Sequence, residues 1–200
     1  HIQIVAAADS GIKSLADLKG KRIAVGAPKS GTELNARDIF RGAGMSYKDF
    51  AKVEYLPFGE SVELMKNRQL DATLISAGLG VAAVRDLATA VPIVIVPIPP
   101  EVVTKIGEAA YQAGAIPADT YKGQTAAIPT VAVQNFLVTH DGVPADTVYA
   151  MTKSMFDNLD QMSAAHAAAK AIDKTKAAAG MPAPLHPGAE KYYREAGLVK

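Results

Sequence analysis

Cysteine is absent from this 200-residue chain, and so are several features that would point to particular functions. Without cysteine the chain can form no disulfide bond, no thiolate metal site and no cysteine nucleophile, which is compatible with an oxidising compartment. Long hydrophobic runs are absent too. The longest, residues 90–98, is too short to cross a membrane and is interrupted by two prolines.

An excess of charge of one sign is also lacking, since the chain has 21 lysines and arginines and 20 aspartates and glutamates. The basic residues are scattered rather than clustered with aromatics, which argues against a nucleic-acid partner. The four histidines, His1, His140, His166 and His186, stand at no metal-ligand spacing, so we expect no metal site. Nucleophile elbows, Walker loops and dinucleotide-binding loops are missing as well, and we expect no cofactor.

Apolar residues make up 49% of the chain, enough for a core in one domain or two small lobes. In the first half, strand-like and helix-like patterns alternate, which predicts an α/β fold with βαβ crossovers and a mostly parallel sheet. The predicted strands are residues 1–5, 22–25, 52–57, 71–75 and 93–96, and the predicted helices are residues 32–41, 61–67 and 80–88.

Proline and glycine become frequent in residues 97–129, which indicates a boundary or surface excursion containing one helix at residues 101–111. Beyond it we predict a strand over residues 130–133 and 136–138, a long helix after residue 146, an alanine-rich helical segment over 164–179 and a last helix over 190–196.

The long helix has an apolar face on which Met151, Met155 and Phe156 are predicted to be core residues. Near the end of the chain, Tyr192 and Tyr193 either form a surface pair or clamp the last helix onto the body, and the sequence leaves both readings open.

The segment Ser30-Gly31-Thr32 follows an apolar strand and opens a helix, where free backbone N–H groups and a positive dipole end favour an anion or carboxylate. A second reading is a capping box, in which Ser30 caps the Glu33 N–H and Glu33 reaches back. Gly31 slightly favours a ligand, because glycine is a poor choice in a first helical turn unless something approaches the backbone.

A second turn of small residues, 76–80, has the same placement between a predicted strand and a helix. Two such turns on one sheet would meet at the same edge and form one wall of a cleft, in which Ala77 and Gly78 are second-rank contacts. Alternatively, its glycines only tighten the turn. Asp71, at the start of the preceding strand, is predicted to be structural.

Three groups of residues resemble a known family. Residues 9–26 resemble the beginning of the second lobe of extracytoplasmic solute-binding proteins. Combined with residues 30–33, 128–133 and 184–193, they are similar to the TAXI branch of the tripartite ATP-independent periplasmic (TRAP) transporters. The resemblance implies a two-lobed, type II periplasmic-binding fold that traps a small carboxylate, such as a glutamate-like amino acid or a dicarboxylate. It also implies delivery to a TRAP membrane permease.

The resemblance further implies how the chain is divided. Residues 1–11 would supply a first-lobe strand and a crossing, 12–116 a complete second lobe, and 117–200 the return crossing, a first-lobe strand and the C-terminal helices. Members of the family begin with further first-lobe strands that do not precede His1, so the first lobe would be partial. A signal peptide is expected to have been removed or to lie upstream, consistent with a periplasmic location.

On this reading Ser30, Gly31 and Thr32 donate hydrogen bonds to the carboxylate, and Thr130 lies at the crossing between lobes. The protein would then bind rather than catalyse, because no nucleophile–base pair can be assembled from the motifs. Two alternatives stay open: a two-lobed enzyme in which a cleft Asp or Glu acts as general acid or base, and an effector-sensing domain of a transcription regulator.

Self-association is a further expectation. A first lobe without its opening strands would leave strand edges beside residues 131–138 uncovered, together with an apolar helix face that includes Val148, Met151 and Met155.

Overall fold

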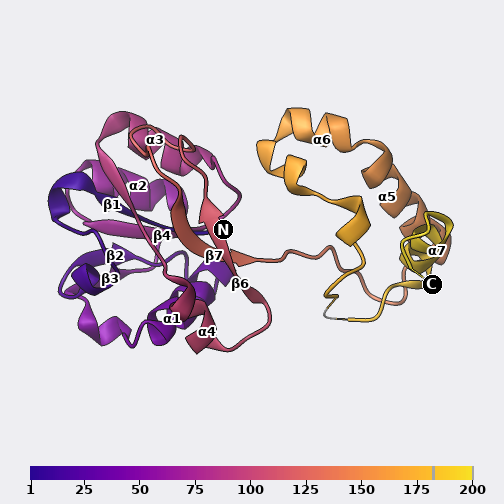
Figure 1. Cartoon of the computed structure of the whole chain (residues 1–200), viewed down its shortest axis with the longest axis horizontal. Helices are drawn as coiled ribbons and strands as arrows, with labels where there is room; N and C mark the ends of the chain where they lie inside the picture. The colour runs from indigo at the N-terminus through magenta and orange to yellow at the C-terminus, as the bar shows by residue number, and fades with distance from the viewer. Residues whose placement is uncertain (182, 200) are drawn as a thin grey trace. The chain divides into compact units, whose positions relative to one another are not determined.

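The computed structural model describes residues 1–181 and 183–199, which form two compact units, residues 1–134 and 135–200 (Figure 1). The first unit contains a seven-stranded sheet covered by helices, and the second unit is helical. The predicted α/β fold class is confirmed.

The sheet of the first unit has the strand order β3-β2-β4-β1-β7-β6, with β5 also paired to β1. Its strands are β1 (Ile2–Ala7), β2 (Arg22–Ala24), β3 (Lys52–Glu54), β4 (Ala72–Ser76), β5 (Ile93–Val96), β6 (Tyr111–Ile116) and β7 (Ile128–Val133). β2 is parallel to β3 and β4, whereas β1 is antiparallel to β4, β5 and β7, and β6 is antiparallel to β7. The prediction of a mostly parallel sheet was therefore wrong for the strand pairings, because β1 runs opposite to both β4 and β5, which the α3 crossover connects.

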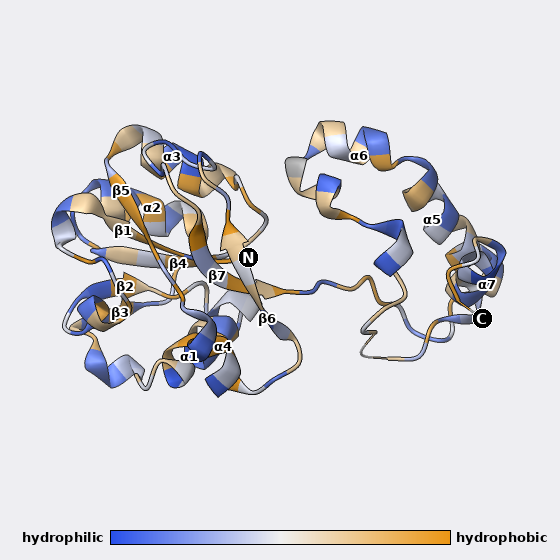
Figure 2. Ribbon diagram, viewed as in Figure 1, coloured by the Kyte–Doolittle hydropathy of each residue, from blue (hydrophilic) through white to orange (hydrophobic). Residues whose placement is uncertain are grey.

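Four helices cover the sheet: α1 (Gly31–Gly42), α2 (Phe58–Lys66), α3 (Ala82–Ala90) and α4 (Pro100–Ile106). Short 3-10 turns lie at Ala8–Ser10, Ala16–Leu18 and Tyr47–Asp49. Alternate side chains of β1 point to opposite faces of the sheet. Ile2, Ile4 and Ala6 belong to a hydrophobic cluster with buried residues of α1 and α4. Val5 and Ala7 pack with α2 and α3. Both faces of β1 are thus buried, and Figure 2 shows the hydrophobic colour of this central strand.

Two predictions near the end of this unit were wrong. The helix predicted over residues 101–111 ends at Ile106, where Gly107 adopts a left-handed conformation (φ 73°), and β6 begins at Tyr111. The strand predicted over residues 136–138 is not formed, because β7 ends at Val133. β7 pairs with β6 along its length and with β1 at Val131. Residues 131–133, which were expected to have an uncovered strand edge, are therefore paired.

Asp71 has the predicted structural role. Its carboxylate accepts hydrogen bonds from the Arg22 backbone N–H (2.8 Å), Arg22 Nε (3.0 Å) and Arg22 Nη2 (2.7 Å). Hydrogen bonding to Arg22 lowers the pKa of Asp71 below its usual value. The pair fixes the start of β4 beside β2, and hence the register of two neighbouring parallel strands.

The second unit contains α5 (Ala145–Asp157), α6 (Leu159–Ala165) and α7 (Pro187–Glu195), with 3-10 turns at Ala167–Ala171 and Lys174–Lys176. The alanine-rich segment forms these short turns instead of the predicted helix, since helix propensity without an apolar stripe does not hold a long helix in place.

Aromatic side chains hold α5 and α7 together. Phe156 stacks on Tyr192 with ring centroids 5.7 Å apart, and Tyr193 meets the Phe156 ring edge-on. The tyrosine pair therefore clamps the last helix onto α5, which resolves the alternative left open by the sequence. Phe156 is a core residue as predicted, but Met151 is 55% exposed and the prediction for it was wrong.

Candidate functional site

The turn between β2 and α1 begins at the carboxyl end of β2, and Ser30 is the N-cap of α1. The Ser30 hydroxyl accepts a hydrogen bond from the Glu33 N–H (3.2 Å), which confirms the predicted cap. The predicted return contact of the capping box, from the Ser30 N–H to the Glu33 side chain, is not formed. The Ser30 N–H donates to the Ala27 carbonyl (3.1 Å), and the Glu33 side chain points elsewhere.

Glu33 is 2% exposed and is held by tertiary contacts. Its carboxylate lies 2.5 Å from Arg37 Nε and accepts a hydrogen bond from the Tyr47 hydroxyl (3.1 Å). Burial and the neighbouring Glu33 raise the pKa of Tyr47, so this hydroxyl stays protonated as the donor. Glu33 thus links α1 to the 3-10 turn at Tyr47–Asp49 rather than to its own N-cap.

The first turn of α1 keeps unused donors. Within residues 1–181 and 183–199, the N–H groups of Gly31 and Thr32 have no backbone acceptor, and the Thr32 hydroxyl has no hydrogen-bond partner. A Cβ placed on Gly31 would meet no atom within 4 Å. No neighbouring protein atom therefore requires glycine at this position, and the space beside it is open.

The second predicted turn uses most of its backbone groups internally. The Ala77 N–H donates to the His1 carbonyl (3.0 Å), and the Ala77 carbonyl accepts from the His1 amine (3.0 Å) and Gln3 Nε2 (3.3 Å). The Gly80 N–H donates to the Tyr121 hydroxyl (3.0 Å). Gly78, between them, has no hydrogen bond to any residue that the structure describes.

Both turns lie at one edge of the sheet, which we name the carboxyl edge because β2 and β4 end there at Ala24 and Ser76. These strands are parallel neighbours, with Ala24 opposite Thr73. Asn35, one turn into α1, bonds Ser76 at the end of β4 (2.9 Å). The structure therefore places Ser30, Gly31 and Thr32 at the same edge as Ala77 and Gly78.

Thr130 lies elsewhere in the sheet. It is in β7, on the far side of β1 from β4, and is 2% exposed. Its hydroxyl donates to the Ile2 carbonyl, so the group is already used within the sheet. A ligand contact for Thr130 stays a prediction.

Sequence reasoning missed a buried pair beside the second turn. Gln3 is fully buried in β1, and its Oε1 accepts a hydrogen bond from the Tyr121 hydroxyl. That hydroxyl also accepts the Gly80 N–H, so it joins β1 to the turn before α3. The available signal was Gln3 itself, a polar residue within the otherwise apolar strand Ile2–Ala7.

Tyr121→Phe is expected to lower the free energy of unfolding by about 1–3 kcal/mol, because it leaves the buried Gln3 Oε1 and the Gly80 N–H without a partner. Urea unfolding checks this. Tyr55→Phe is the matched control, since Tyr55 is 40% exposed and its hydroxyl bonds no described residue. Equal stability of the two variants would contradict the role given to Tyr121.

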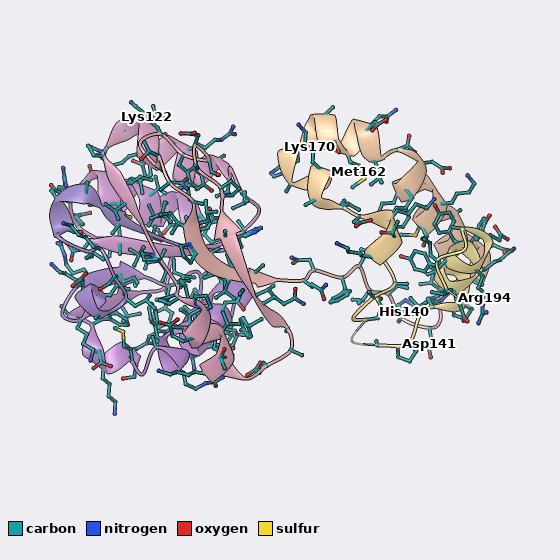
Figure 3. All side chains as sticks on the ribbon, in the orientation of Figure 1. Lys122, His140, Asp141, Met162, Lys170 and Arg194 are labelled. Carbon is teal, nitrogen blue, oxygen red and sulfur yellow. The ribbon has the colours of Figure 1, made fainter. Side chains whose placement is uncertain are left out.

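An open hollow of about 420 Å³ lies between α3 and the loop after β6, and its lining includes Arg85, Tyr121 and Lys122. Lys122, labelled in Figure 3, is exposed at the surface of this unit. None of the six predicted site residues lines the hollow. The case for a site at the carboxyl edge therefore depends on its unused donors and not on a cavity.

Two further properties concern the described part of the chain. Across residues 1–181 and 183–199, none of the helices combines the length and apolar character needed to cross a bilayer. The same residues contain no cluster of three or more His, Cys, Asp or Glu side chains that could hold a metal ion.

Solved structures that this chain resembles are periplasmic binding proteins. The aliphatic sulphonate binding protein from Escherichia coli is 16% identical with a TM-score of 0.49, over 84% of this chain and 46% of that one. The alkanesulfonate-binding protein from Xanthomonas axonopodis pv. citri, bound to MOPS, is 16% identical with a TM-score of 0.48, over 98% and 63%. An ancestral arginine-binding protein bound to arginine is 17% identical with a TM-score of 0.44, over 97% and 58%.

This chain therefore spans less than two thirds of the length of each of these proteins. The NMT1-like family matches residues 1–197, nearly the whole sequence. The chain belongs to the NMT1-like family.

Proposed function

We propose that this chain is part of an extracytoplasmic solute-binding protein that captures a small carboxylate at the carboxyl edge. The observation that carries the proposal is the set of unused donors in the first turn of α1: the N–H groups of Gly31 and Thr32 and the Thr32 hydroxyl. A helix N-terminus with free N–H groups favours an anion and needs no titrating group, so the proposed role is binding without catalysis.

The finer proposal is a TAXI-type protein that delivers its ligand to a TRAP permease from the periplasm. It is supported by the similarity of residues 30–33, 128–133 and 184–193 to that branch, and membership of the NMT1-like family is compatible with it. A glutamate-like amino acid or a dicarboxylate is the proposed ligand class, since both present a carboxylate to the helix.

The lobe assignment is also a proposal. Residues 12–116 would form the second lobe, and β1 and β7, which the resemblance assigns to the first lobe, belong to the same sheet as β2, β3 and β4. Self-association is supported by apolar side chains that are exposed in the second unit, among them Leu137, Val138 and Met151.

Thr32→Ala is expected to weaken carboxylate binding roughly tenfold to a hundredfold, because it removes a hydrogen bond to a charged group worth about 1.5–3 kcal/mol. Its effect on melting should be small, since the Thr32 hydroxyl has no partner among the described residues. Isothermal titration calorimetry of the intact protein with L-glutamate and with glutarate measures the affinity.

Ser30→Ala separates binding from capping. It should reduce stability by about 1 kcal/mol through loss of the Glu33 cap, and also reduce affinity. If Thr32→Ala binds both compounds like the wild type while Ser30→Ala only melts earlier, the turn is a capping device and the ligand lies elsewhere.

A further inference from the structure

A chain of polar side chains leads from the carboxyl edge into the space between α1 and β6. Asn35 Nδ2 lies 2.9 Å from Ser76 Oγ, and Asn35 Oδ1 lies 3.0 Å from the Tyr111 hydroxyl oxygen. That hydroxyl lies 2.6 Å from Asp38 Oδ2, and the other Asp38 oxygen is 2.9 Å from Arg41 Nη2. Ser76 is the end of this chain at the carboxyl edge.

The protons in this chain can be counted. The Tyr111 hydroxyl has one proton, and it faces two oxygen atoms, those of Asp38 and Asn35. Asp38 is ion-paired with Arg41 and can only accept, so the shorter contact takes the proton. Burial and Asp38 raise the pKa of Tyr111, which keeps the hydroxyl protonated. Asn35 Oδ1 would then face a second oxygen at 3.0 Å with no proton between them.

Turning the Asn35 amide by 180° removes this conflict. Its nitrogen and oxygen have nearly the same shape, so hydrogen-bond partners decide which atom lies where. With the nitrogen toward Tyr111, each contact has its own proton: Ser76 donates to Asn35, Asn35 donates to Tyr111, and Tyr111 donates to Asp38.

We infer that the hydrogen bonds run in this direction and make Ser76 Oγ an acceptor for the ammonium group of an α-amino acid whose carboxylate lies on the first turn of α1. The inference rests on the proposed carboxylate site. Every bond in the chain points toward the Asp38 carboxylate, which polarises the Ser76 oxygen and strengthens it as an acceptor.

The spacing suits such a ligand. Gly31 and Asn35 are four residues apart and lie on the same face of α1, separated by about 6 Å along the helix axis. Asn35 holds Ser76 on that face, and a side chain at Gly31 would meet no protein atom there. Donors for a carboxylate and an acceptor for an ammonium group therefore lie about one helical turn apart. Ser76 becomes the residue that distinguishes an amino acid from a plain carboxylate.

Neutron diffraction of deuterium-exchanged protein tests the direction without any ligand. We expect deuterium on the Asn35 side-chain atom that faces Tyr111. Deuterium on the atom that faces Ser76 would overturn the inference, whatever the protein binds.

Calorimetry with L-glutamate and glutarate, which differ by the ammonium group, tests the role of Ser76. Ser76→Ala should lower the affinity for L-glutamate roughly tenfold or more and change that for glutarate less than about twofold. Ser154→Ala, at an exposed position in α5, is the matched control and should change neither. Equal losses for both compounds, no loss for L-glutamate, or tighter binding of glutarate than of L-glutamate by the wild type would overturn the inference.

If the proposed carboxylate site is wrong, the measured affinities differ from those expected for a wrong assignment of Ser76. Thr32→Ala should weaken both compounds alike, because both place a carboxylate on α1. Binding of neither compound by the wild type contradicts the proposed function and the ligand role of Ser76 together, while the neutron result still decides the direction of the hydrogen bonds.

Discussion

Gly26→Ala is expected to lower the free energy of unfolding by about 2–5 kcal/mol and to abolish carboxylate binding at α1. Gly26 adopts a φ of +95°, a conformation that side chains other than glycine rarely adopt. A Cβ there would lie 2.7 Å from both Cβ and Cγ2 of Thr32 and 3.2 Å from Ser30 Oγ. The side chains at the start of α1 would have to move, which displaces the donors of the proposed site.

Gly31→Ala is the matched control for Gly26→Ala, five residues away in the same turn. A Cβ at Gly31 meets nothing, so stability should be unchanged or raised by up to about 1 kcal/mol. Urea unfolding compares the stability of the two variants, and calorimetry with L-glutamate compares the binding of Gly26→Ala with that of the wild type. A Gly26→Ala protein as stable as Gly31→Ala would show that the β2–α1 turn tolerates a side chain and would contradict this account of its packing.

Gly188→Ala is expected to separate α7 from α5 and to destabilise the second unit by about 3 kcal/mol or more. A Cβ at Gly188 would lie 2.1 Å from the Ala145 carbonyl oxygen and 2.7 Å from the Tyr149 backbone nitrogen. Backbone atoms cannot rotate aside as a flexible side chain can. The two helices must therefore move apart, and the stack of Phe156 on Tyr192 is lost.

Near-ultraviolet circular dichroism reports the environment of the tyrosines, and limited trypsin digestion reports local opening of residues 135–200. Gly59→Ala in α2 is the control, because a Cβ there meets no atom within 4 Å. Retention of the wild-type tyrosine signal and protease resistance in Gly188→Ala would exclude the close helix contact.

Local patterns predicted much of the first unit because strands and helices there alternate at short range. The strand at residues 93–96 and the helix after Ser30 follow from β-branched runs and a capping serine. Strand direction could not be predicted in the same way. β1 pairs with residues more than 60 positions away, and no local pattern encodes which way those partners run.

At the candidate site, too, local contacts could be predicted from the sequence and long-range contacts could not. Ser30 was recognisable as a cap because its partner, Glu33, is three residues away. The partner of the Glu33 carboxylate could not be predicted, because Tyr47 reaches it only after the chain has folded back. The hydroxyl of Tyr121 bonds Gln3 across 118 positions, so its role depends on tertiary structure alone.

The central position of β1 has a consequence for synthesis of the chain. Residues 2–7 leave the ribosome before all of their hydrogen-bonding partners, which are residues 72–76, 93–96 and 131. One edge of the most buried strand stays unpaired until β4 has emerged, and the other until β5 has followed. Pairing of β1 is therefore delayed until β4 and β5 have been synthesised, and such long-range pairings favour slow folding. Such a delay keeps the nascent chain unfolded for longer, the state in which a polypeptide can be threaded through a narrow channel.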